Sequence, residues 1–292
     1  MKAFILAGTC MLLFAAACSG QPQGVGKIDS LMSASHWDAS ATPFIVTLDN
    51  RTNCGPGDTP PPNRVDTSDR VDGLIAELNS NNYNAYIIPT GDEHQSEFPP
   101  ESDLRRRYIS GFSGSAGYAV VLSDGQRALW TDGRYFLQAD DELDCQWLFM
   151  KELITGVPTL LEFLKDNLSN GDVVAADSSL LGYGTWTRLE KGLGESGISL
   201  VASSTNLVDT VWEADSDNPR PEYVKDSAYS YSIKYAGQSF EEKLTNVRAS
   251  MASEGAQAMV ISTLDESAWL YNVRGNDITF NPVVRSYAIV QE

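Results

Sequence analysis

Hydrophobic positions along the chain recur with two spacings, one typical of helices and the other of short strands. Val71, Leu74, Ile75 and Leu78 fall on one helical face, with the spacing i, i+3, i+4, i+7. Residues 85–88 form a short apolar run, as expected for a buried strand. The same alternation continues with predicted strands at 118–122, 127–131, 147–150, 173–176 and 198–202 and predicted helices at 134–143, 160–168 and 186–193. This order predicts an α/β domain with a mixed sheet flanked by helices.

A second unit begins with the signature of a helix start. Ser239 and Glu242 have the spacing of a capping box, in which each residue satisfies a backbone N–H group of the first turn. Residues 240–251 then carry one apolar helical face, and residues 258–261 form the next apolar strand.

The two units repeat one order of helix, turn, apolar strand and acidic pair. Asp92–Glu93 and Asp265–Glu266 follow the two strands at the same distance, and residues 118–121 resemble residues 287–290. The repetition predicts a tandem duplication and a turn role for both acidic pairs. Because the second copy stops at Glu292, soon after its second strand, we expect that copy to be incomplete and the natural protein to continue.

The N-terminal residues have the pattern of a targeting segment. Lys2 precedes a short apolar run that ends in small residues, which predicts a secretory signal peptide; a buried helix and a lipoprotein signal ending at Cys18 are the alternatives. We therefore expect a secreted or extracellular protein, and a membrane anchor in a missing C-terminal part is left open. The predicted organisation is a signal peptide at 1–20, an irregular leader at 21–63, a first domain at 64–213, a linker at 214–236 and the start of a second domain at 237–292.

Charge and cysteine content add two constraints. The chain has 292 residues and a formal net charge of −18, which argues against nucleic acid or an anionic membrane as the main partner. Two of its four cysteines, Cys54 and Cys145, lie outside the predicted signal peptide. Export to an oxidising compartment would allow these two to form a disulfide.

No residue pattern in the chain predicts a catalytic or metal-binding site. His36 and His94 are the only histidines, and the spacings typical of zinc sites are absent from the sequence. We expect His94 to be a loop residue that hydrogen-bonds within its own turn. The glycine-rich residues 111–117 match neither a nucleotide-binding nor a nucleophile-elbow pattern, so a tight structural turn is expected there.

Arg134 is the one charged residue with an unusual predicted position. It follows Asp132, which we expect to cap a helix, and would therefore lie in the first helical turn. A cation is unfavourable there because the helix dipole places positive charge at that end. Either a surface salt bridge or a functional role would explain its position.

Several longer motifs resemble one enzyme family. The segments that carry the resemblance in the first unit are 84–89, 92–97, 108–117 and 129–138, the last of which reads Leu-Trp-Thr-Asp-Gly-Arg-Tyr-Phe-Leu-Gln. They resemble the N-terminal region of Xaa-Pro aminopeptidases (aminopeptidase P), of the creatinase-like superfamily. The segments 235–237, 264–270, 272–277 and 281–283 are similar to the opening of the second domain in the three-domain eukaryotic form. The signal peptide and cysteines make the chain more similar to the secreted or membrane-type branch.

The resemblance implies tandem creatinase N-terminal-like domains, the second incomplete, from an enzyme that removes the residue preceding proline at a peptide N-terminus. It implies that two metal ions, usually Mn²⁺ with Zn²⁺ as an alternative, are bound by a C-terminal domain whose ligands are absent from this sequence. It associates Arg134 with binding of proline-containing peptides, and the N-terminal domains with homodimer formation and the active-site entrance. A non-catalytic protein that keeps these domains for interaction or dimerisation is the alternative.

Overall fold

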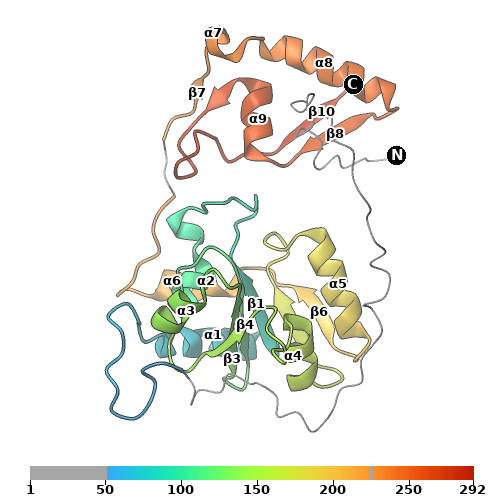
Figure 1. Ribbon diagram of the computed structural model, residues 1–292. Helices are drawn as coiled ribbons and strands as arrows, with labels where there is room; N and C mark the ends of the chain where they lie inside the picture. Colours follow the sequence, from blue (N-terminus) through green and yellow to red (C-terminus); the bar gives the residue numbers. More distant parts are fainter. Residues whose placement is uncertain (1–50, 224–225) are drawn as a thin grey trace, which may run out of the picture.

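The structure is a computed structural model that describes residues 51–223 and 226–292 (Figure 1). The predicted signal peptide and most of the predicted leader lie outside these residues. The elements of the first unit are α1 (Ser68–Ser80), β1 (Ala85–Pro89), η2 (Glu101–Asp103), α2 (Arg105–Ser110), β2 (Tyr118–Leu122), β3 (Arg127–Thr131), α3 (Phe136–Glu142), β4 (Leu148–Lys151), α4 (Leu160–Asn167), β5 (Val173–Ala176), α5 (Tyr183–Gly194), β6 (Ser199–Ala202) and α6 (Leu207–Ala214). The second unit contains β7 (Tyr229–Ser230), α7 (Ile233–Ala236), α8 (Phe240–Ser253), β8 (Ala258–Ile261), α9 (Leu264–Tyr271), β9 (Val273–Arg274) and β10 (Ala288–Gln291).

The first unit is built on a mixed six-stranded sheet with the order β4-β3-β2-β1-β5-β6. Only β2 runs against the others, because it pairs antiparallel with both β1 and β3, whereas the remaining pairs are parallel. The strands predicted at 118–122 and 127–131 are confirmed as β2 and β3. The α/β class with a mixed sheet is confirmed.

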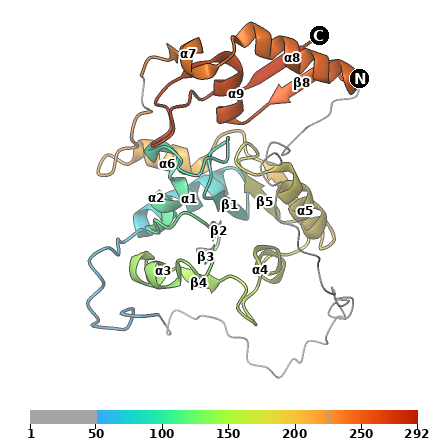
Figure 2. The ribbon, with the colours of Figure 1, turned by 45° about the horizontal axis from the view of Figure 1, so that its top comes forward.

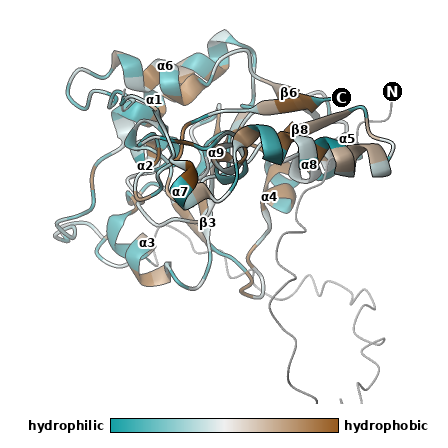
Figure 3. Cartoon of the chain, turned by 90° about the horizontal axis from the view of Figure 1, so that it is seen from above, coloured by the Kyte–Doolittle hydropathy of each residue, from teal (hydrophilic) through white to brown (hydrophobic). Residues whose placement is uncertain are grey.

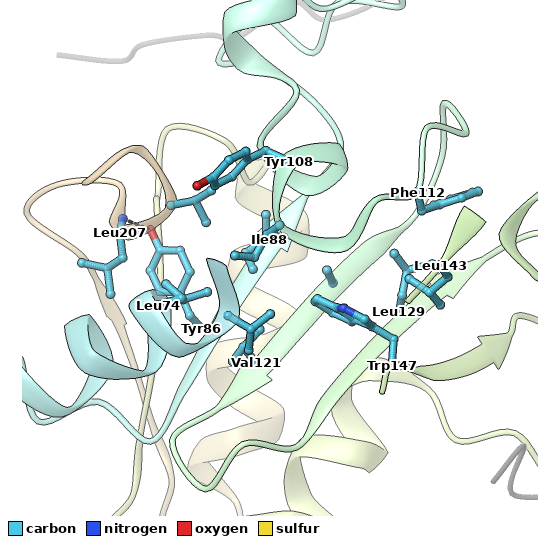
Figure 4. Close-up of a cluster of buried hydrophobic side chains, with 14 of the residues drawn as sticks. Leu74, Tyr86, Ile88, Tyr108, Phe112, Val121, Leu129, Leu143, Trp147 and Leu207 are labelled. Atoms are coloured by element: carbon cyan, nitrogen blue, oxygen red, sulfur yellow. Dashed lines mark hydrogen bonds between the residues drawn. The ribbon is translucent and has the colours of Figure 1, made fainter. Parts of the chain in front are cut away.

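Successive residues of a strand point to opposite sides of the sheet, and helices cover both of its faces. Residues such as Tyr86, Ile88 and Val121 pack with α1, α2, α3 and α6, and Figure 4 shows this cluster. Ile87 and Val120 point the other way, into a second cluster with α4 and α5. In Figure 3, strand β6 is coloured as hydrophobic, whereas the outer helix α1 is mostly hydrophilic.

The hydroxyl group of Tyr86 is buried in the first cluster but keeps its hydrogen bonds. It accepts from the backbone N–H of Leu207 at 3.2 Å, the dashed line in Figure 4, and lies 3.1 Å from the hydroxyl of Ser203. Burial raises the pKa of Tyr86 to about 12, so the hydroxyl stays neutral. The bond connects the central strand to the start of α6.

The described end of the predicted leader is fixed to the first unit. A disulfide joins Cys54 to Cys145, whose Cα atoms are 5.5 Å apart. The buried guanidinium of Arg51 donates to the carbonyls of Leu143 (2.6 Å), Asp144 (2.6 Å) and Asp140 (3.0 Å), at the C-terminal end of α3. A cation at this end satisfies carbonyls that lack a partner within the helix.

The second unit repeats the central strand pair of the first. Ser239 and Glu242 form the predicted capping box at the start of α8. Strand β8 pairs with β10 so that Val260 lies opposite Ile289, as Ile87 lies opposite Val120 in the first unit. Residues 229–236, predicted as part of the linker, form β7 and α7, and β7 pairs with β9.

The acidic pairs do not repeat, so the prediction of a turn role for both is wrong. Asp92 and Glu93 lie in a loop after β1, whereas Asp265 and Glu266 lie in the first turn of α9. Carboxylates are favourable in a first helical turn because of the helix dipole. Among the helices described, none is long and apolar enough to cross a membrane.

A charged cluster connects the two units, which Figures 1 and 2 show one above the other. Its centre is the carboxylate of Asp103, whose side chain is 0% exposed. Asp103 accepts hydrogen bonds from Tyr223 (2.6 Å) in the connection and from Arg285 (2.9 Å) in the second unit, and Arg105 lies 2.9 Å away. Arg285 also pairs with Glu93 of the first unit.

Burial alone would lower the pKa of Arg285, but hydrogen bonding to Glu93 and the charge of Asp103 outweigh it and raise that pKa. Arg285 is therefore charged whenever the units are in contact. An arginine fork that engages two carboxylates of the other unit fixes direction as well as distance. We call these contacts of Arg285 with Asp103 and Glu93 the junction pair.

The disulfide predicts a difference in stability between oxidised and reduced protein. Replacing Cys54 and Cys145 with serine should lower the free energy of unfolding by about 4 kcal/mol, because the bond closes a loop of 91 residues in the unfolded chain. Urea unfolding measures this, and intact mass after thiol alkylation, with and without reductant, measures pairing. Alkylation of Cys54 and Cys145 in the unreduced folded protein would contradict the pairing.

The junction pair predicts that one substitution separates the units. Arg285→Met leaves Asp103 without a partner from the second unit, so cleavage by chymotrypsin within residues 216–231 should speed up at least tenfold. Arg107→Met is the control, because its ion pair with Glu101 is exposed at 3.4 Å and such pairs contribute little. Equal cleavage rates for both variants and the unchanged protein would contradict the role of the junction pair.

Candidate functional site

The carboxyl ends of five strands meet at one edge of the first sheet, since only β2 is reversed. The loops that follow β1, β3, β4 and β5 all leave this edge. Binding sites of open α/β sheets usually lie outside the carboxyl ends of their strands. We therefore consider this edge as the candidate site.

Arg134 lies on this edge, after β3, and is held by Asp132. Its Nε and Nη2 atoms donate to the two carboxylate oxygens of Asp132 at 2.9 Å and 2.7 Å. These hydrogen bonds lower the pKa of Asp132 to about 2, so the pair stays ionised at neutral pH. The guanidinium is exposed and also lies over the ring of Tyr135, 5.1 Å from its centre.

The predicted position of Arg134 in a first helical turn is wrong. Helix α3 begins at Phe136, and Asp132 instead accepts the backbone N–H of Arg134 in the turn before the helix. The dipole argument therefore does not apply. The salt bridge predicted as one explanation is present, and it leaves the outer face of the guanidinium in solvent.

The glycine-rich loop beside Tyr135 has the structural role that the sequence predicts. A Cβ atom on Gly117, whose φ is +140°, would lie 2.1 Å from the carbonyl oxygen of Trp130. Beneath the loop, the buried Arg106 donates to the carbonyls of Ala116 (2.8 Å) and Gly114. Burial lowers the pKa of Arg106 to about 10. The hydroxyls of Ser115 and Tyr135, 2.6 Å apart, connect the loop to the segment that carries Arg134.

His94 is a loop residue, as predicted, but its ring contacts the second unit. The backbone N–H of His94 donates to Asp92 at 3.0 Å, within its own turn. The ring stacks on Tyr287 with centroids 4.4 Å apart, and Nδ1 lies 3.2 Å from the carbonyl oxygen of Ser262. The loop after β1 therefore forms part of the junction between the units.

Glu152 and Arg285 are two further residues of this region that the sequence does not predict. Glu152 follows β4, and its backbone N–H donates to Thr131 at 3.0 Å, which places it beside the segment of Arg134. Burial and the nearby Asp132 raise the pKa of Glu152. An acidic residue two positions after the strand predicted at 147–150 was the available signal for Glu152. Arg285 lies in a loop, and no local pattern marks it.

The described residues do not fit a metal centre. In residues 51–223 and 226–292, no group of three or more His, Cys, Asp or Glu side chains is placed to hold an ion. We therefore derive no hydrolytic step from these residues. What they offer is an exposed arginine with a fixed orientation, a partly buried carboxylate and backbone groups, which suit recognition of a peptide.

Family comparison matches both units to one domain type. The Creatinase/Prolidase N-terminal domain matches residues 70–211, and a second version of the same domain matches residues 219–292. These ranges correspond to the six-stranded unit and to the unit that contains β8 and β10.

Two relatives show the same similarity over most of the chain. Xaa-Pro aminopeptidase 1 of Dictyostelium discoideum is 42% identical over 231 residues, which are 78% of this chain and 37% of that protein. The crystal structure of an X-prolyl aminopeptidase from Caenorhabditis elegans is 32% identical and has a TM-score of 0.71, covering 78% of this chain and 38% of the other. The chain thus spans a little over one third of the length of these relatives.

The prediction of a secreted or extracellular protein, in which a membrane anchor was left open, is wrong, because the comparison with the nematode enzyme contradicts it. The nematode enzyme, which shares the fold over 78% of this chain, is described as a cytosolic enzyme with a di-nuclear active site. A lysine followed by a short apolar run also occurs in buried helices, so this pattern alone does not distinguish a signal peptide from a buried helix.

The tandem matches, the shared fold and the identity over both units agree. The chain belongs to the creatinase/prolidase N-terminal domain family and corresponds to the N-terminal region of Xaa-Pro aminopeptidases.

Proposed function

We propose that this chain is the peptide-recognising part of an enzyme that removes the N-terminal residue from peptides with proline in the second position. The observation that supports this most is the pair of tandem family matches, together with 42% identity to an Xaa-Pro aminopeptidase. Hydrolysis would take place at two metal ions, Mn²⁺ or Zn²⁺, held by residues other than those described.

Arg134 is the residue of this chain that we propose contacts the peptide. Its pair with Asp132 uses Nε and Nη2, and no contact within the described residues engages Nη1. A guanidinium whose orientation is fixed on one side donates well to a carbonyl or carboxylate on the other. The hydrogen bonds from Arg134 lower the pKa of Asp132 to about 2, so this contact should not depend on pH above about pH 4.

The activity is tested with a chimera in which residues 51–292 replace the corresponding part of the nematode enzyme. Addition of Mn²⁺ should allow release of the first residue from an Xaa-Pro-Pro peptide, and a chelator should abolish it. A folded chimera without activity above the chelated sample would contradict the proposal.

Arg134→Ala in this chimera should reduce kcat/KM about tenfold, because the loss of one charge-assisted hydrogen bond costs about 1.5 kcal/mol. The bound metal content should stay the same. Arg248→Ala is the control, since Arg248 lies on α8 of the second unit and donates only to a backbone carbonyl, that of Gln291. Unchanged kinetics for Arg134→Ala would leave only the salt bridge to Asp132 as its role.

We also propose that the chain forms a homodimer through β8. Among the described residues, β8 pairs only with β10, and Val260 and Ile289 are 51% and 63% exposed. An open strand edge beside an apolar face favours pairing with a second copy. Because the net charge of −18 opposes association, raising the salt concentration should strengthen it.

Sedimentation velocity of the whole chain should show a reversible dimer, and Val260→Lys should make it monomeric. Leu137→Lys is the control, because Leu137 is exposed on α3 of the first unit. A monomer at all protein and salt concentrations would contradict the dimer.

A further inference from the structure

Two adjoining hollows follow the carboxyl edge of the first sheet. The first, of about 470 Å³, is lined mainly by apolar side chains from β3, the loop after β4 and the helices α4 and α5. The second, of about 360 Å³, lies between the loop after β1 and the start of α5. They share Tyr118, Glu152 and Thr185, so they form one surface feature, which we call the edge groove.

Glu152 lies where the two hollows meet. No Lys, Arg or His side chain among the described residues forms an ion pair with it, and burial with the nearby Asp132 raises its pKa. The carboxylate of Glu152 is thus partly removed from water and close to a second carboxylate, and in the part of the chain that the structure describes it has no cation beside it to offset its charge. A cation that enters the groove would supply one.

Leu153, the next residue, also lines the groove and has two unfavourable features. Its side chain is 100% exposed, and its φ is +63°, in the left-handed region. For a residue other than glycine, this conformation costs about 1–2 kcal/mol. Strain of this kind concentrates at functional sites, and here it places an apolar side chain at the rim of the groove.

The lining distinguishes between possible ligands. Val157 and Pro158 line the first hollow together with Leu153, so it offers an apolar wall. Lysine and arginine have an aliphatic stem that packs on such a wall while the charged head reaches a carboxylate. An acidic side chain would be repelled by Glu152, which is unpaired among the described residues, and a free α-ammonium has no stem.

The charge distribution gives the direction in which such a side chain lies. Arg188 is exposed on the α5 side of the first hollow, whereas no basic residue lines the second hollow. The cationic head is therefore favoured at Glu152, facing the second hollow. Its stem then lies along the apolar wall.

We propose that the edge groove binds a lysine or arginine side chain of a peptide, with Glu152 as the counter-ion of its charged group. The inference rests on the proposed function and names a substrate preference. Glu152 and Arg134 follow the paired strands β4 and β3, in which Lys151 lies opposite Thr131. Because neighbouring strands are about 4.8 Å apart, the loops that carry Glu152 and Arg134 start side by side at this edge.

Binding to the whole chain tests the groove directly. Fluorescence anisotropy compares two labelled peptides, Ala-Pro-Pro-Lys-Ala and the same peptide with norleucine in place of lysine. The lysine peptide should bind at least tenfold more tightly, and Glu152→Gln should remove this difference. Glu190→Gln, which removes an exposed carboxylate from α5, should keep it. Equal affinity of the two peptides for the unchanged chain would overturn the proposal.

Two further arms separate the charge from other causes. N-acetylation of the lysine peptide should leave its affinity unchanged. A loss of affinity on acetylation would show that the α-ammonium is the bound group and would overturn the proposal. Leu153→Gly keeps the left-handed backbone and removes the apolar stem contact, so it should weaken both peptides equally. An unchanged affinity of both peptides for this variant would remove the apolar wall from the proposal and overturn it.

The chimera distinguishes this proposal from the proposed function. Hydrolysis of the norleucine peptide reports the proposed aminopeptidase activity whether or not the groove binds a cation. Glu152→Gln should raise KM for the lysine peptide about tenfold and leave KM for the norleucine peptide and both kcat values unchanged. An active chimera without this selective change would overturn the groove proposal alone.

Discussion

The direction of the strands in the first sheet is the constraint on which the candidate site depends. Because only β2 is reversed, the loops that carry Asp132, Arg134 and Glu152 leave the same edge of the sheet. The hydrophobic clusters on the two faces hold the strands in this register, since a shift by one residue would exchange the buried sets. Packing of Ile88 on one face and Ile87 on the other thus determines where polar groups at the strand ends meet.

Charged groups then fix positions that packing alone leaves free. Asp132 fixes the guanidinium of Arg134, and Asp103 with Glu93 fixes Arg285 of the second unit. Both depend on the bidentate geometry of arginine, but they differ in burial. The Asp132 pair is exposed and contributes orientation more than stability, whereas the Asp103 cluster is buried and becomes costly when one partner is removed.

The elements that could be predicted from sequence are those whose apolar spacing is regular. The strands at 173–176 and 118–122 and the capping box at Ser239 have the predicted bounds, because a short apolar run and cap chemistry are local properties. Helix α3 begins two residues later than predicted, since Asp132 forms a turn instead of a cap, and this changed the explanation for Arg134. Glu152 and Arg285 could not be identified as important from the sequence. Glu152 is placed by the pairing of β4 with β3, and Arg285 by carboxylates 182 and 192 residues away in the chain, and neither arrangement leaves a local sequence pattern.

The duplication shows why equal strand pairs do not give equal surfaces. Val260 and Ile289 occupy the register of Ile87 and Val120, and all four side chains are β-branched and apolar. Ile87 and Val120 are 0% exposed because α4 and α5 cover them, while Val260 and Ile289 have no such cover among the described residues. Burial is therefore a property of the layer that lies over a strand and not of the strand itself. For the same reason, the acidic residues after the two strands took different roles: the loop after β1 is held against the second unit, whereas the residues after β8 continue directly into helix α9.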